Sequence, residues 1–165
     1  MSIPDLAAVL WRQRELLERL VYRLECEQLL VAAGRTRFLG IATAEVESLL
    51  DELRVVEVQR AAMADLVAAE VGLDAGVSLE EIAGSVQPPW TEVFVEHRHA
   101  LLTLAAELSA LAETNRHLMA AGLTAVEQAM AGLGLRQGTT SVGYDAQGRR
   151  ETIAGQVRTV VDRAL

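Results

Sequence analysis

The sequence has few of the residues that interrupt helices or cross-link chains. Proline occurs only at Pro4, Pro88 and Pro89, so two long stretches contain no residue of the kind that breaks a helix. Cys26 is the only cysteine, which excludes an internal disulfide and fits a reducing compartment. Aromatic residues make up 4% of the chain and hydrophobic residues 51%, so leucine, valine and alanine must supply the core. This composition is typical of helices packed on helices.

Lysine is absent, and the sequence of 165 residues contains 15 arginines and 23 acidic residues, which gives a formal net charge of -8. This acidic balance argues against a nucleic-acid partner, because phosphate backbones are bound by basic surfaces. The sequence contains no uninterrupted apolar run of the ~18 residues that a membrane span requires, so we expect none. Residues 1–5 show no basic region before an apolar run, and we therefore expect no secretory signal and a cytoplasmic protein.

Apolar residues that alternate at spacings of three and four predict three long helices, over residues 4–33, 41–71 and 88–133. Gly34 and Gly72 are predicted to end the first two helices. The short connection between the first two makes them antiparallel neighbours. The sequence therefore predicts an all-α fold, an elongated bundle of three long antiparallel helices over residues 1–133.

The apolar residues at these spacings form a seam along each predicted helix, and a few seam positions hold polar residues. We interpret these polar residues as ones that set the helix register or are exposed. They include Gln13, Arg60 and Glu70. A single asparagine at such a position often fixes the register or the oligomeric state, and Asn115 is interpreted in this way in preference to direct contact with a partner protein. Between the second and third helices, Ser78 and Glu81 form a capping-box pattern, which predicts a short linker helix. Toward the end of the third helix the seam side chains become smaller, from leucine to Gly122, Ala125 and Ala129. This predicts that a partner helix approaches closely there.

The C-terminal part differs from the bundle in composition. Residues 134–150 contain four glycines and are predicted to form a flexible linker. Residues 151–165 have helical apolar spacing and predict a tethered amphipathic helix. Residues 133–165 hold five arginines and three acidic residues, whereas residues 1–132 hold 10 arginines and 20 acidic residues. Two interpretations remain open: the terminal helix binds another protein, or it packs on its own acidic bundle as a fourth helix.

No pattern in the sequence predicts catalysis, a metal site or a cofactor. Cys26 has no motif around it and is interpreted as a buried thiol. His97 and His99 are two residues apart and so lie on different sides of a helix, and His97 is expected to be hydrogen-bonded within the core. His117 raises the hypothesis of a histidine phosphotransfer domain, but Ala120 stands where that family usually has lysine.

Two segments carry a resemblance to a known family. The first is Thr114-Asn115-Arg116-His117-Leu118-Met119, within a long helix that has leucines at heptad spacing. The second is Tyr144-Asp145-Ala146-Gln147-Gly148-Arg149, which follows the linker glycines. In these segments, and in the order of the predicted helices, the chain resembles the FlgN family of flagellar type III export chaperones.

The resemblance implies a cytoplasmic chaperone that binds the C-terminal helical segments of the hook-filament junction proteins FlgK and FlgL. It also implies docking on the export-gate protein FlhA, with Tyr144 as the docking residue. The implied client-binding residues lie in the terminal helix: Ile153, Val157, Val160, Val161 and Leu165. The alternative is a structural coiled-coil or helical-bundle module that only associates with itself as a homo-oligomer.

Overall fold

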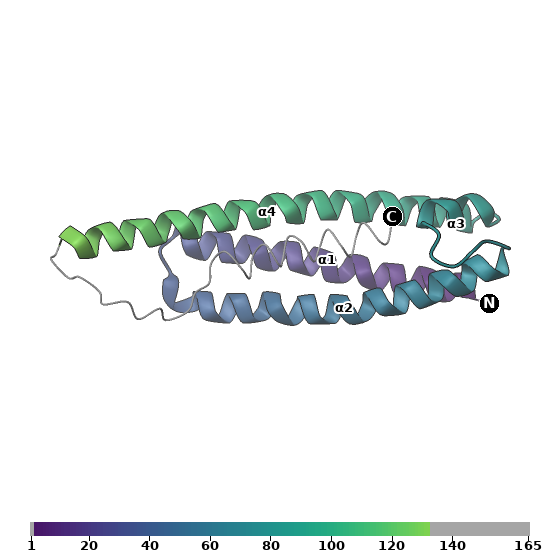
Figure 1. Ribbon diagram of the computed structural model, residues 1–165, viewed down its shortest axis with the longest axis horizontal. Coiled ribbons are helices and arrows are strands. Elements are labelled where there is room, and N and C mark those ends of the chain that lie inside the picture. The colour runs from purple at the N-terminus through teal and green to yellow at the C-terminus, as the bar shows by residue number, and fades with distance from the viewer. Residues whose placement is uncertain (1, 133–165) are drawn as a thin grey trace.

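The structure, a computed structural model, describes residues 2–132 as a chain of helices (Figure 1). Three are long: α1 spans Ser2–Ala32, α2 spans Leu39–Glu70 and α4 spans Trp90–Gly132. A 3-10 helix, η1 (Thr36–Phe38), and the short α3 (Leu79–Ser85) lie between them. The predicted all-α fold is confirmed. The predicted linker 134–150 and terminal helix 151–165 lie outside the described residues.

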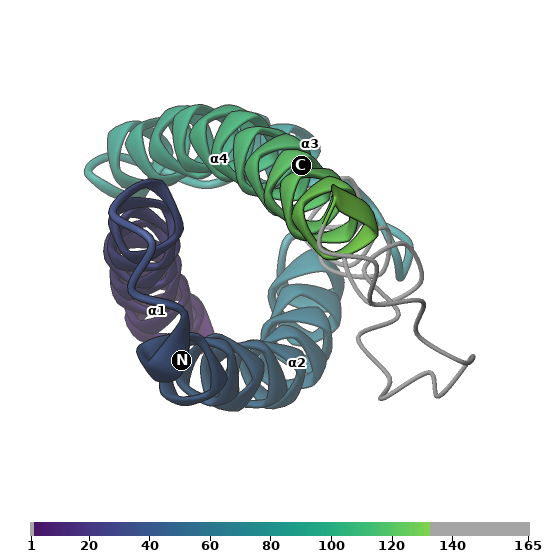
Figure 2. The ribbon, with the colours of Figure 1, turned by 90° about the vertical axis from the view of Figure 1, so that its left-hand side faces the viewer.

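The helix α1 is the common neighbour in the bundle, because it packs along both α2 and α4. It runs antiparallel to α2 and parallel to α4, and Figure 2 shows the three long helices around one core. Buried leucines on one face of α1 supply much of that core, together with matching apolar residues of α2 and α4. The largest fully buried apolar side chains are Leu6, Leu10, Leu17, Leu20, Leu24, Leu53, Leu79, Ile82, Phe94, Leu101 and Leu108.

Local signals end the helices where the sequence predicts. Gly34 and Gly72 have φ values of 66° and 78°, a left-handed conformation that residues with a Cβ rarely adopt. Ser78 caps α3 through the predicted box: its hydroxyl accepts from the Glu81 amide, while the Glu81 carboxylate accepts from the Ser78 amide at 2.8 Å. These hydrogen bonds lower the pKa of Glu81.

The start of α1 differs from the prediction. Ser2 is the first residue of α1, and its amide and hydroxyl both donate to the Glu70 carboxylate, at 3.2 and 2.7 Å. These hydrogen bonds lower the pKa of Glu70. The antiparallel arrangement brings the end of α2 beside the start of α1, where a carboxylate is favourable. Glu70 therefore lies at the surface and stabilises a helix terminus.

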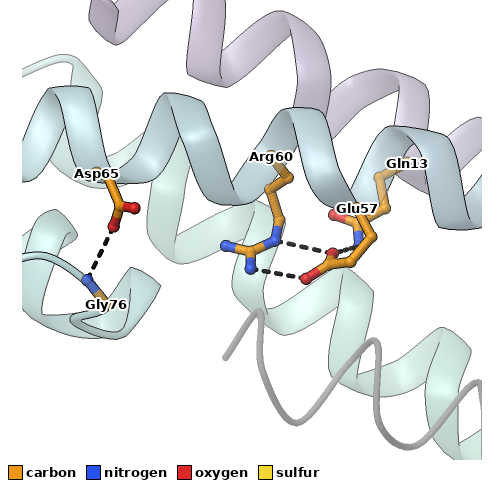
Figure 3. A network of polar contacts seen from close by, with 5 residues as sticks. All are labelled: Gln13, Glu57, Arg60, Asp65 and Gly76. Atoms are coloured by element: carbon orange, nitrogen blue, oxygen red, sulfur yellow. Dashed lines mark hydrogen bonds and ion pairs between the residues drawn. The ribbon is translucent and has the colours of Figure 1, made fainter.

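A first group of polar side chains in the bundle joins α1 to α2 (Figure 3). The Arg60 guanidinium donates two hydrogen bonds to the Glu57 carboxylate, at 2.9 and 2.8 Å, and Gln13 donates to the same carboxylate at 3.2 Å. Gln13 and Arg60 are buried. Farther along α2, the Asp65 carboxylate accepts from the Gly76 amide at 2.8 Å and holds the linker against the helix. The seam interruptions Gln13 and Arg60 are thus paired inside the bundle.

Candidate functional site

A second polar group fixes the register of α1 against α4. The Asn115 side-chain amide donates to the Leu24 carbonyl at 2.9 Å and to the Glu27 carboxylate at 3.0 Å, and Thr43 of α2 donates to the same carboxylate at 3.1 Å. Asn115 and Glu27 are buried, so sliding α4 by one turn would remove the Asn115 donor from a buried carboxylate. Asn115 therefore acts as a register residue, and its burial removes it from direct contact with a partner protein.

This register places the end of α1 well before the end of α4. Ala32 ends α1 five residues after Glu27, so α1 stops near Ala120, which follows Asn115 by the same number. Because α4 continues to Gly132, residues 120–132 project beyond α1 at the end of the bundle (Figure 1). We name this segment the α4 extension. At ~1.5 Å per residue it is roughly 20 Å long.

The core-facing side of α4 continues along the extension. Eleven residues make about three helical turns, so residues at this separation share a face. Leu123 therefore lies on the same face as buried Leu101 and Ala112, which precede it by 22 and 11 residues. Val126 lies on the same face as buried Asn115, 11 residues before it. Yet Leu123 is 53% exposed and Val126 is 56% exposed. The face that forms the core earlier in α4 is therefore not covered by the described residues once α1 has ended.

The chemistry of the extension is that of an interaction surface. Glu127 is the only charged residue between residues 120 and 132. The hydroxyl of Thr124 donates back to the Ala120 carbonyl at 3.1 Å, so this polar group is already satisfied within the helix. Covering the exposed half of Leu123 or Val126 would contribute about 1 kcal/mol each. An uncharged helix face of this kind suits an apolar helix as its partner.

The turn between α1 and α2 lies at the same end of the bundle as the extension (Figure 1). The exposed apolar residue Phe38 belongs to η1 in this turn, and exposed Ile41 belongs to the first turn of α2. Arg37 places its guanidinium 4.5 Å from the centre of the Phe38 ring.

The sequence-based interpretation of the α4 terminus is corrected by this arrangement. The small residues Gly122, Ala125 and Ala129 were expected to admit a partner helix of the same bundle. No helix of the described residues lies there, and Gly122 has no neighbouring atom where a Cβ would stand. The lengths of the predicted helices already indicate an uncovered end, because the third helix is much longer than the first.

The structure corrects two further expectations. His97 is buried, but neither of its ring nitrogens has a hydrogen-bond partner among the described residues; instead the Trp11 ring packs against it edge-on. Burial, and then the Arg14 charge, lower the pKa of His97 to about 4. Cys26 is half-buried rather than buried, and its hydrogen bond with Tyr22 raises the pKa of Tyr22. His99 is exposed, as its spacing from His97 predicts.

His117 is exposed, and its Nε2 lies 2.8 Å from the Glu113 carboxylate. Within residues 2–132 no group of three or more histidine, cysteine or acidic side chains is arranged to hold a metal ion. No described helix is both long and apolar enough for a membrane span. The sequence-predicted residues Tyr144, Ile153, Val157, Val160, Val161 and Leu165 lie outside the described part of the chain.

The family model described as FlgN protein matches residues 1–152, which is most of the chain. No curated protein and no solved structure gives a significant match. The matched residues include the complete helical bundle, the Asn115 segment and the Tyr144 segment, and so cover both parts of the sequence that carry the resemblance. The chain belongs to the FlgN family, which is a family of flagellar export chaperones and not of enzymes.

Proposed function

We propose that this protein binds the C-terminal helical segments of FlgK and FlgL in the cytoplasm and delivers them to the export gate through FlhA. Family membership supports the chaperone role. The observation that carries the proposal is the α4 extension, where the core-facing side of a helix continues without a covering helix among the described residues. A client helix placed there would occupy the position that α1 occupies along the rest of the bundle.

The terminal segment supplies the second part of the proposed client site. Ile153, Val157 and Val160 recur at helical spacing, and the segment is too short to be stable as an isolated helix in water. Binding that orders a segment spends free energy on the ordering, which keeps such a complex reversible. A carrier that must release its client at the gate requires this reversibility.

Isothermal titration of the full chain with purified FlgK or FlgL tests the client site. Val126→Asp places a charge on the uncovered face, and we expect it to weaken client binding at least tenfold, or about 1.4 kcal/mol. Thr124→Asp is the matched control, because it adds the same charge on the opposite side of the same helix. Removal of residues 151–165 is expected to weaken binding to a similar extent. Unchanged affinity in both the Val126→Asp and truncated proteins would refute the proposal.

Docking on FlhA is assigned to Tyr144 and is measured separately. Tyr144→Ala is expected to weaken binding of the chaperone to the cytoplasmic domain of FlhA, while its affinity for FlgK stays the same. Equal gate affinity in the variant would remove Tyr144 from the site. Sedimentation of the protein without client tests the alternative function, since a module that only associates with itself would form oligomers and bind neither junction protein.

A further inference from the structure

The bundle has a position for a fourth helix that the described residues fill at one end only. The helix α1 packs along both α2 and α4, but α2 and α4 are not packed on each other (Figure 2). The short α3 packs against α4 and also contacts α2, and its Leu79, Ile82 and Ala83 are buried in the core. Beyond α3, no helix within residues 2–132 continues along this side of α4.

An ion pair marks the side of α4 that α3 covers. The Arg98 guanidinium lies 2.8 Å from the Glu80 carboxylate of α3. Residues separated by four, seven or eleven positions share one side of a helix, so the positions that continue this side can be counted from Arg98. We name them the α4 slot, and they are Leu102, Ala105, Ser109, Ala112, Arg116 and Met119.

The slot differs in composition from the solvent-facing side of the same stretch of α4. The exposed positions on that other side hold mainly polar residues, among them Thr103, Glu107 and Glu113. The slot has one charged residue, Arg116, whose Nε donates to the Glu113 carboxylate at 3.1 Å. Leu102 is 43% exposed. A mainly apolar side whose single charge is already paired suits a covering helix.

The chain itself contains a segment that can reach the slot. The helix α4 ends at Gly132, and residues 133–150 connect it to the apolar segment 151–165. A flexible linker of this length has a root-mean-square end-to-end distance of roughly 21–25 Å. At ~1.5 Å per residue, a point about 24 Å back along α4 from Gly132 lies near Arg116. A helix of residues 151–165 that runs antiparallel to α4 from this point is about 22 Å long and ends near Leu102.

The side chains of this segment complement the slot in size. Its apolar residues are branched, namely Ile153, Val157, Val160 and Val161. The middle of the slot is small, namely Ala105, Ser109 and Ala112. Large side chains opposite small ones allow two helices to interdigitate. Charge does not oppose the contact, because residues 1–132 hold an excess of acidic residues and residues 133–165 an excess of arginine.

We propose that residues 151–165 occupy the α4 slot as a fourth helix in the free protein, antiparallel to α4 and in line with α3. This packing does not depend on the proposed function, but its consequence rests on it. The same segment supplies part of the proposed client site, so a client helix has to draw it out of the slot. The bundle is therefore an internal competitor that weakens client binding.

Hydrogen exchange of the full chain without client tests the packing. We expect the amides of residues 151–165 to exchange at least tenfold more slowly in the full chain than in a synthetic peptide of the same sequence. Leu102→Asp places a charge in the slot and should remove this protection. Ser109→Trp fills the slot without a charge and should do the same. Thr103→Asp is the matched control, because it adds the charge at the next residue on the solvent-facing side, and should keep the protection.

Three results would overturn the proposal. The first is an unprotected segment in the parent protein, or protection that survives both slot variants. The second is protection that Val126→Asp removes and Leu102→Asp does not, which would place the segment on the α4 extension instead. The third is protection that appears only as the protein concentration rises, together with a dimer in sedimentation, which would assign the slot to the terminal segment of a second copy.

Titration with FlgK measures the competition separately. We expect Leu102→Asp to raise the affinity for FlgK at least threefold, because the terminal segment no longer has to leave the slot. Thr103→Asp should bind FlgK as the parent protein does. Equal affinity in Leu102→Asp and the parent would refute the competition. If neither the parent nor any variant binds FlgK, the proposed function fails, while the exchange experiment still decides the packing.

Discussion

Buried polar residues in this bundle differ in how well they are satisfied, and their effects on stability differ accordingly. Asn115 and Glu27 bind one another across α1 and α4, so their burial specifies one register. His97 is equally buried but has no hydrogen-bond partner in the described part of the chain. Its neutral form is strongly favoured, because a charged imidazole there would lose its hydration and lie close to Arg14. The Glu96 carboxylate, which lies 3.5 Å from the Arg14 guanidinium, raises the pKa of His97 but offsets only part of the lowering.

The lowered pKa of His97 predicts a loss of stability in mild acid. The unfolded chain takes up the proton near its ordinary pKa of ~6.5, whereas the folded protein does so only near a pKa of about 4. The unfolded state therefore binds more protons between these values, and the free energy of unfolding falls as the pH falls through this range. The decrease is about 2 kcal/mol at pH 5. His97→Leu should flatten this dependence in urea unfolding from pH 4 to 7, and exposed His99→Leu should not; an unchanged slope in His97→Leu would contradict the assignment.

Local chemistry explains several of the helix boundaries. The glycines at 34 and 72 end α1 and α2, and the capping box starts α3, so these boundaries can be derived from a few adjacent residues. The helix α3 has seven residues and is too short to be stable alone. Its buried Leu79 and Ile82 pack into the core beside α4, while the Ser78 hydroxyl accepts from the Glu81 amide. The cap and the packing therefore both contribute to the stability of this linker.

Ser78→Ala is expected to destabilise the protein by about 1 kcal/mol, because it removes the side-chain acceptor of the Glu81 amide. Thermal unfolding followed by circular dichroism measures the loss. Ser48→Ala, at an exposed position within α2, serves as the control and should leave the unfolding midpoint nearly unchanged. A similar midpoint for Ser78→Ala and the parent protein would show that packing alone holds α3.

At the scale of the whole molecule, the unequal lengths of the long helices matter most. The helix α1 has 31 residues and α4 has 43, and their parallel register places the excess of α4 at one end. Apolar residues on one side of α4 are therefore buried along most of the helix and exposed near its end. Leu108 lies in the core, but Val126, on the same side of α4, is exposed.

Stability measurements should separate these two parts of α4. Leu108→Ala is expected to cost 2–5 kcal/mol, roughly the usual range for a truncated core leucine. Val126→Asp should change the free energy of unfolding by less than about 0.5 kcal/mol, as for other exposed positions. Urea unfolding of both variants provides the comparison. A large loss in Val126→Asp would mean that another part of the chain covers the extension in the free protein.

The helical class, the three long helices and most of their ends follow from the sequence alone, because apolar spacing, glycine and capping residues act within a few neighbouring positions. It also contained the FlgN resemblance, in the segments around Asn115 and Tyr144. It did not show that His97 lacks hydrogen-bond partners, because this depends on which side chains of α1 lie opposite. The point along α4 at which α1 stops is visible only in the folded protein. That point depends on the register set by Asn115 and Glu27, which are far apart in the sequence, and it determines which part of an apolar face becomes core and which remains exposed.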